Sequence, residues 1–178
     1  MQGKLDWIGL SYYGRDLVQF DGNRRSLLGR CIPGRGPDPL EGGLGEFHPQ
    51  GLFEALQRLS RLRIPIYITE NGIPDEDDDL RPRYIIAHLH QVWRALQLSY
   101  PVVGYYHRTL VDSFEWTEGW TQRFGLHSFD PGSLVRERRR SAQLMSEIVG
   151  SGAITTELID QYAPQLRKQV FPEPGPDA

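Results

Sequence analysis

The sequence has a single cysteine, Cys31, no long apolar run, and no large excess of charge of either sign. One cysteine excludes an intramolecular disulfide and a metal site built from several thiolates. No apolar stretch approaches the ~20 residues that a membrane-spanning helix needs, so we predict no membrane partner. The 178 residues, 39% of them hydrophobic, are enough to fill the core of one globular domain.

The charges nearly balance, with 20 basic and 23 acidic side chains and a formal net charge of -3. Nucleic-acid binders concentrate an excess of Lys and Arg on one face, so we predict no nucleic-acid partner. We interpret the only basic run as the solvated face of a helix; it consists of Arg136, Arg138, Arg139 and Arg140. The first residues carry no apolar run typical of a secretory signal, which predicts a cytoplasmic protein.

Short apolar segments alternate with amphipathic ones along the chain. Strands are predicted at 7–13, 65–69 and 101–106, and helices at about 52–62, 82–98 and 141–149, with a further short helix capped by Thr155 or Thr156. The Gly-rich and Pro-rich stretch 22–45 is predicted to be an irregular loop, and residues 165–178 a disordered tail.

This order of elements indicates parallel strands joined by right-handed helical crossovers, and hence an α/β fold. Three strands are few for such a sheet. Because a complete (β/α)₈ barrel takes roughly 250 residues, the chain forms either a small open sheet or part of a larger one.

Two carboxylates lie just beyond the ends of predicted parallel strands, where α/β enzymes place their sites. Glu70 follows the second strand, and Glu115 lies in an aromatic segment after the third. The rings of that segment belong to Phe114, Trp116 and Trp120. Aromatic rings pack on the apolar faces of sugars, and carboxylates accept hydrogen bonds from neighbouring hydroxyls. The pattern favours a sugar site, against the plainer interpretation of a surface carboxylate and core rings.

The motifs around these carboxylates resemble those of the family 1 glycoside hydrolases, the β-glucosidases and β-galactosidases with a (β/α)₈ fold. Tyr67–Gly72 (YITENG) resembles the family's nucleophile signature. The other matches are Asp6–Tyr13 with its sixth-strand motif, Pro49–Leu52 with the start of a helix, Asp112–Trp120 and Arg123–Gly125 with its sugar-binding segment, and Arg140–Ala142 with its last helix. The resemblance implies that residues 1–164 are the C-terminal part of such a barrel, approximately strands six to eight with their helices.

The resemblance also implies roles for individual residues. Glu70 would be the nucleophile that forms a covalent glycosyl-enzyme. Tyr13 would donate a hydrogen bond to Glu70 and help to keep it ionised. Glu115 and Trp116 would bind the hydroxyls of the sugar, and Phe124 would line the same pocket.

Three positions depart from the family pattern. Ser11 and Ser113 stand where the family usually has Asn, and Arg108 stands where it usually has a Trp that stacks on the sugar. An arginine removes the flat apolar wall and brings a positive charge to the substrate-binding site. It would either hold Glu70 ionised or bind an anionic sugar group. A structural alternative is that Arg108 pairs with Asp112.

The carboxyl group that would protonate the leaving oxygen is missing. Retaining hydrolysis needs it roughly 5 to 5.5 Å from the nucleophile. The family supplies it from an Asn-Glu-Pro motif after strand four, but neither Asn23 nor Asn71, the only asparagines here, precedes a glutamate. We therefore expect the C-terminal portion of a retaining β-glycosidase for terminal β-linked sugars, completed by a separate N-terminal barrel portion. The alternatives are a transglycosidase and a non-catalytic sugar-binding remnant.

No metal, nucleotide or flavin cofactor is indicated. The only close pair of histidines, His88 and His90, lies two residues apart on a predicted helix, so the two rings face different sides. Three strands cut from a barrel also leave two open edges. We expect an isolated chain to aggregate or to need a partner. The apolar side chains of its uncovered inward face would include Ile8, Leu10, Ile66 and Val103.

Overall fold

The computed structural model describes residues 3–23, 27–32, 40 and 44–172. Its strands are β1 (Ile8–Ser11), β2 (Val18–Phe20), β3 (Gly29–Cys31), β4 (Ile66–Asn71), β5 (Val102–His107), β6 (His127–Phe129) and β7 (Arg136–Arg138). Its helices are α1 (Pro49–Ser60), α2 (Arg81–Gln97), α3 (Arg140–Ser151), α4 (Thr156–Tyr162) and α5 (Arg167–Val170), with a 3₁₀ helix at Pro164–Leu166. Within these described ranges, no helix is both long enough and apolar enough to cross a bilayer.

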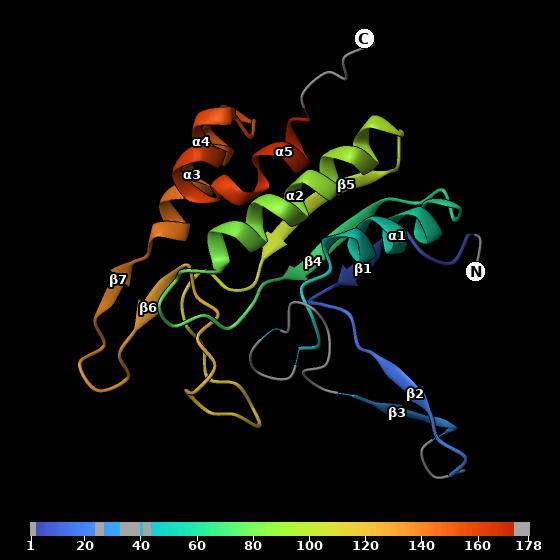
Figure 1. Cartoon of the computed structure of the whole chain (residues 1–178), viewed down its shortest axis with the longest axis horizontal. Helices are drawn as coiled ribbons and strands as arrows, with labels where there is room; N and C mark the ends of the chain where they lie inside the picture. The colour runs from blue at the N-terminus through green and yellow to red at the C-terminus, as the bar shows by residue number, and fades with distance from the viewer. Residues whose placement is uncertain (1–2, 24–26, 33–39, 41–43, 173–178) are drawn as a thin grey trace.

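The central sheet is parallel, with the strand order β1-β4-β5. Neighbouring parallel strands need a crossover, and α1 and α2 supply the two crossovers here. Figure 1 shows both helices lying along the same face of the sheet. The predicted alternation of three strands with helices is therefore confirmed, and β4 is the middle strand.

The helix-covered face of the sheet forms the first core. Leu52 and Leu56 of α1 and Ile66 and Ile68 of β4 are fully buried, and Leu10 of β1 packs against them. The prediction that Leu10 and Ile66 lie on the uncovered face was wrong. Side chains of a strand alternate between its two faces, and the sequence alone does not say which face the helices cover.

The opposite face of the sheet, which we call the open face, is a row of aromatic rings. The ring of Trp7 meets Tyr67 edge-on at 5.5 Å, and Tyr67 lies 6.5 Å from Tyr106. Trp7 and Tyr106 are more than half exposed. At Gly104 any side chain would collide with the Tyr67 ring, so this close packing requires glycine. The open face is thus an apolar surface that no described segment of the chain covers.

The second core lies between α2 and the C-terminal helices. Ile85, Ile86, Leu144 and Ile159 are fully buried in it, and Leu166 is nearly so. The prediction of a disordered tail from residue 165 was wrong as far as residue 172, because burial of Leu166 orders the 3₁₀ helix and α5. Residues 173–178 lie outside the described part of the chain. The predicted cap of α4 is confirmed, since the Thr155 hydroxyl accepts from the Leu158 amide.

Two short hairpins were not predicted. β2 pairs with β3; β3 lies inside the stretch 22–45 expected to be an irregular loop, and β2 lies just before it. Most of residues 33–43 lie outside the described ranges. β6 pairs with β7, so Arg136 and Arg138 lie on a strand and not on a helix face. Strands of three residues are too short to show a period of two, which is why the sequence pattern missed both hairpins.

Candidate active site

The predicted site residues gather at one edge of the parallel sheet. Glu70 lies at the carboxyl end of β4, Tyr13 two residues beyond β1, and Arg108 one residue beyond β5. Because the strands are parallel, all three carboxyl ends meet at this edge. Side chains from segments far apart in the sequence therefore converge on Glu70.

Glu70 has two partners. The Tyr13 hydroxyl donates a hydrogen bond to Glu70 Oε2, and Arg108 Nη1 lies 3.5 Å from Glu70 Oε1. Burial, and after it the hydrogen bond to Glu70, raises the pKa of Tyr13. Tyr13 therefore stays a protonated donor at physiological pH, and its hydrogen bond fixes the orientation of the Glu70 carboxylate.

Glu115 is bound on both of its oxygens. Arg108 Nη2 donates to Glu115 Oε2 at 2.5 Å, and the Ser113 hydroxyl donates to Glu115 Oε1 at 2.9 Å. The Arg108 guanidinium also lies 5.5 Å from the centre of the Phe124 ring. Burial alone would lower the pKa of Arg108, but its anionic surroundings raise that pKa overall. Arg108 is thus a fixed cation between Glu70 and Glu115.

The two aromatic candidates lie in different environments. Phe124 is buried and meets the Tyr13 ring edge-on at 6.2 Å, so it lines the cluster. Trp116 is 95% exposed. It lies in a tight turn in which the backbones of Glu115 and Gly119 exchange two hydrogen bonds, at 2.7 and 2.8 Å. The structure therefore brings Phe124, and not Trp116, together with the other predicted site residues.

The two residues after Glu70 explain why its motif continues with Asn and Gly. Buried Asn71 donates to the Tyr12 carbonyl at 2.7 Å and accepts from the Tyr105 hydroxyl at 2.8 Å, which ties the three strand ends together. At Gly72 a Cβ atom would collide with the Arg108 carbonyl oxygen. The local sequence thus fixes the backbone on which the carboxylate stands.

Comparison with known proteins settles the family of this site. The family model described as Glycosyl hydrolase family 1 matches residues 1–153. The chain belongs to glycosyl hydrolase family 1. A β-galactosidase of Saccharolobus solfataricus is 39% identical over 166 residues, which are 89% of this chain and 34% of that protein. A chloroplastic galactolipid galactosyltransferase of Arabidopsis thaliana is 36% identical over 157 residues, 85% of this chain and 24% of that protein.

Solved structures of family 1 enzymes share the fold. A β-glycosidase from Pyrococcus horikoshii matches with a TM-score of 0.83 and 34% identity, over 91% of this chain and 38% of that one. These family 1 neighbours are (β/α)₈ barrels, and the three-stranded sheet described above is a part of that fold. The chain spans about a third of the length of the curated relatives it matches first.

Asp112 has a different partner from the one considered in the sequence. It does not pair with Arg108; its carboxylate accepts from Arg139 at 2.9 and 3.1 Å and from the Gly125 amide at 2.7 Å. The Asp112 side chain is 1% exposed and that of Arg139 is 9% exposed. This buried pair anchors both ends of the segment that carries Glu115. No sequence signal indicated it, because the partners lie 13 and 27 residues apart.

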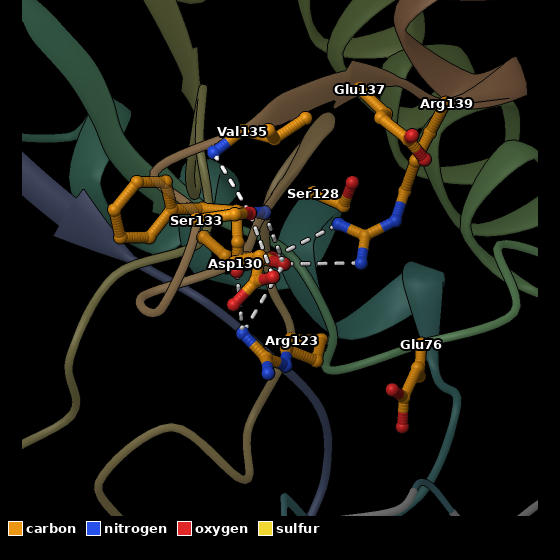
Figure 2. Close-up of a pocket in the computed structure, with 10 residues that line it drawn as sticks. Glu76, Arg123, Ser128, Asp130, Ser133, Val135, Glu137 and Arg139 are labelled. Carbon is orange, nitrogen blue, oxygen red and sulfur yellow. Dashed lines mark hydrogen bonds and ion pairs between the residues drawn. The ribbon is translucent and has the colours of Figure 1, made fainter.

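The Asp112 pair borders a polar pocket of about 450 Å³ beside the β6–β7 hairpin. Figure 2 shows Arg123 and Arg139 pointing into this pocket from two separate loop positions, with Glu137 of β7 beside Arg139. Both guanidinium groups of the pocket pair with one carboxylate, that of Asp112. In this family 1 chain the ion pairs of Asp112 beside the pocket therefore hold the segment that carries Glu115.

Metal-binding side chains do not gather in the part of the chain that the structure describes. None of its His, Cys, Asp and Glu side chains form a group of three or more that could hold a metal ion. His88 is fully buried, its Nδ1 lies 2.8 Å from the Tyr84 carbonyl oxygen, and burial lowers its pKa to about 3. His88 is thus a neutral core residue of α2.

Proposed function

We propose that this chain is the C-terminal portion of a retaining β-glycosidase that acts on terminal β-linked glucosides or galactosides, with Glu70 as its nucleophile. In this proposal β1, β4 and β5 correspond to strands six, seven and eight of the family barrel. The observation that carries the proposal is the contact of Tyr13 with Glu70 at the carboxyl edge of the sheet. Family membership and the names of the relatives support the substrate class.

The chemistry assigned to Glu70 is a double displacement. Its carboxylate attacks the anomeric carbon, the bond to the leaving oxygen breaks, and a glycosyl ester forms with inversion. Water then attacks the same carbon and gives its proton to an acid/base carboxylate, the ester bond breaks, and a second inversion restores the configuration. Tyr13 would orient the attacking carboxylate, and Glu115 and Phe124 would bind the sugar ring. Trp116 joins this site only if the turn at its exposed position moves.

The leaving oxygen needs a proton, and a separate portion of the barrel would supply it. The sequence lacks the Asn-Glu-Pro motif that provides the acid/base carboxylate. We do not assign this role to Glu115, which forms an ion pair with Arg108 and accepts a hydrogen bond from Ser113. The open face, with its exposed Trp7 and Tyr106, is the surface on which the remaining strands would pack. We therefore propose an N-terminal barrel portion as the partner.

A transglycosidase is the second candidate. The observation that favours it is the similarity to the galactolipid galactosyltransferase of Arabidopsis thaliana. In that reaction a sugar hydroxyl, and not water, would attack the anomeric carbon of the ester at Glu70. The hydroxyl would lose its proton to the acid/base carboxylate. Adding an acceptor glycoside separates the two reactions, since hydrolysis releases free sugar and transfer releases a longer glycoside.

The experiment uses the purified chain mixed with the N-terminal two thirds of the Saccharolobus solfataricus β-galactosidase. The mixture is incubated with an activated 2-deoxy-2-fluoroglucoside, and the labelled peptide is mapped by mass spectrometry. We expect the label on Glu70, and we expect Glu70→Gln to abolish it because an amide is not a nucleophile. The matched control Glu137→Gln, on exposed β7, should keep the label. Sugar binding without label would instead indicate a non-catalytic remnant.

A further inference from the structure

Arg108 contacts both carboxylates of the candidate site at once. Its Nη2 lies 2.5 Å from Glu115 Oε2, and its Nη1 lies 3.5 Å from Glu70 Oε1. The Arg108 side chain is 26% exposed, so solvent reaches the cluster from one side. We call this set of three residues the charge bridge.

The charge bridge places the Arg108 guanidinium between the two carboxylates. Arg108 occupies one carboxylate oxygen and Ser113 the other. A serine hydroxyl can rotate away without losing a charged partner, but release of Arg108 separates two opposite charges. A neutral sugar that enters the space between Glu70 and Glu115 must therefore break the contact of Glu115 with Arg108.

We propose that Arg108 lowers the affinity of this site for neutral sugars: its guanidinium is an internal competitor that holds the position between Glu70 and Glu115. This inference rests on the proposed function, because it takes Glu115 as a sugar-binding group. The role of Arg108 is exerted through Glu115 and Glu70 and needs no contact with the reacting carbon. The charge bridge weakens the binding of neutral sugars and makes their binding dependent on ionic strength.

The same geometry argues against Arg108 as a receptor for an acidic sugar. With both carboxylates ionised, two negative charges face one guanidinium, so the charge bridge keeps a net negative charge. A third carboxylate brought to Arg108 would be repelled by Glu70 and Glu115 at short range. We therefore expect a neutral hexose to bind no less tightly than the corresponding uronic acid.

The test measures how fast each carboxylate of the full chain reacts with a carbodiimide and an amine, by peptide mass spectrometry. Arg108→Gln should make Glu115 react about 2- to 5-fold faster, the effect of losing a partly exposed ion pair. Arg108→Lys keeps the charge but presents a single donor group, so it should be intermediate. Arg167→Gln is the matched control, because it removes an Arg–Asp pair of the same 2.5 Å distance elsewhere.

The second arm adds glucose and follows its protection of Glu115. Half-maximal protection should need about 2- to 5-fold less glucose in Arg108→Gln than in the unmodified chain. At 0.5 M NaCl the unmodified chain should approach the variant, because salt screens the charge bridge, whereas the variant should barely change. Glucuronate, which differs from glucose at the C6 carboxylate, is the matched anionic probe.

Several results would overturn the inference while leaving the proposed function intact. One is an equal rate of Glu115 modification with and without Arg108, and another is equal protection by glucose in both proteins. Stronger protection by glucuronate than by glucose, lost in Arg108→Gln, would show that Arg108 is a receptor for anions and not a competitor. If Arg108→Gln speeds the modification of Glu115 but glucose protects Glu115 in no variant, the proposed sugar site is rejected. The proposed competition between Arg108 and the sugar is then rejected as well.

Discussion

Replacing Asp112 should destabilise the segment that carries Glu115. Asp112→Ala removes the partner of Arg139, whose side chain is only 9% exposed, and leaves the Gly125 amide without its acceptor. Removing one member of a buried ion pair costs about 3–5 kcal/mol, because the other charge stays buried without a partner. Asp112→Asn keeps the shape and one acceptor oxygen, so its loss of unfolding free energy should be smaller.

The assay is urea unfolding followed by tryptophan fluorescence. Trp120 reports on this region, because its ring lies 5.4 Å from that of Phe129, and the Phe129 amide donates a hydrogen bond to Asp112. With a urea dependence of about 2 kcal/mol per molar, the Asp112→Ala midpoint should fall by roughly 1.5–2.5 M. The matched control is Asp160→Ala, which breaks the exposed pair with Arg167 and should cost at most about 1 kcal/mol. Equal midpoint shifts for the two variants would refute the anchoring role of Asp112.

Three further outcomes are expected. The chain alone should hydrolyse nitrophenyl β-glucoside at least ~10²-fold more slowly than a full-length relative assayed beside it, because general acid catalysis is missing; an equal rate would exclude the need for a partner. Burial lowers the pKa of His88 from 6.5 to about 3. The unfolded chain therefore binds a proton that the folded chain does not, and the free energy of unfolding should fall as the pH drops from 6.5 towards 3, by up to ~1.4 kcal/mol per pH unit, with a flatter profile in His88→Gln. Leu166→Ala should cost about 2–5 kcal/mol in a thermal or urea melt, against at most ~0.5 for exposed Val149→Ala, and equal effects would contradict the burial of the C-terminal helices.

The parts of the site that the sequence predicts are those fixed by short stretches of chain. Glu70 is placed by its own strand and by Asn71 and Gly72 beside it, so a local motif indicated its position. The Asp112–Arg139 pair and the contacts of Arg108 depend on how distant segments meet. A sequence pattern contains the residues of such pairs but not the pairing.

The fold shows the same division. Helical periods and buried strands are repeated over many residues, and the order of strands and helices follows from them. At the C-terminus the Pro-rich composition led to the prediction of disorder, although Leu166 is buried and packs in the second core. The alternation along β1 and β4 also could not tell the helix-covered face from the open face, since both carry apolar side chains.

The position of β4 between two neighbours has a consequence for local opening. It pairs with β1 on one side and with β5 on the other, on both sides at residues 66–68, whereas β1 and β5 each pair on one side only within the described sheet. Amide exchange should therefore be slowest at residues 66–68, the stretch that leads to Glu70, and faster in the flanking strands that lead to Tyr13 and Arg108. Local unfolding of the edge strands would then move Tyr13 and Arg108 while the β4 backbone that carries Glu70 stays folded. This region should therefore unfold from β1 and β5 towards β4.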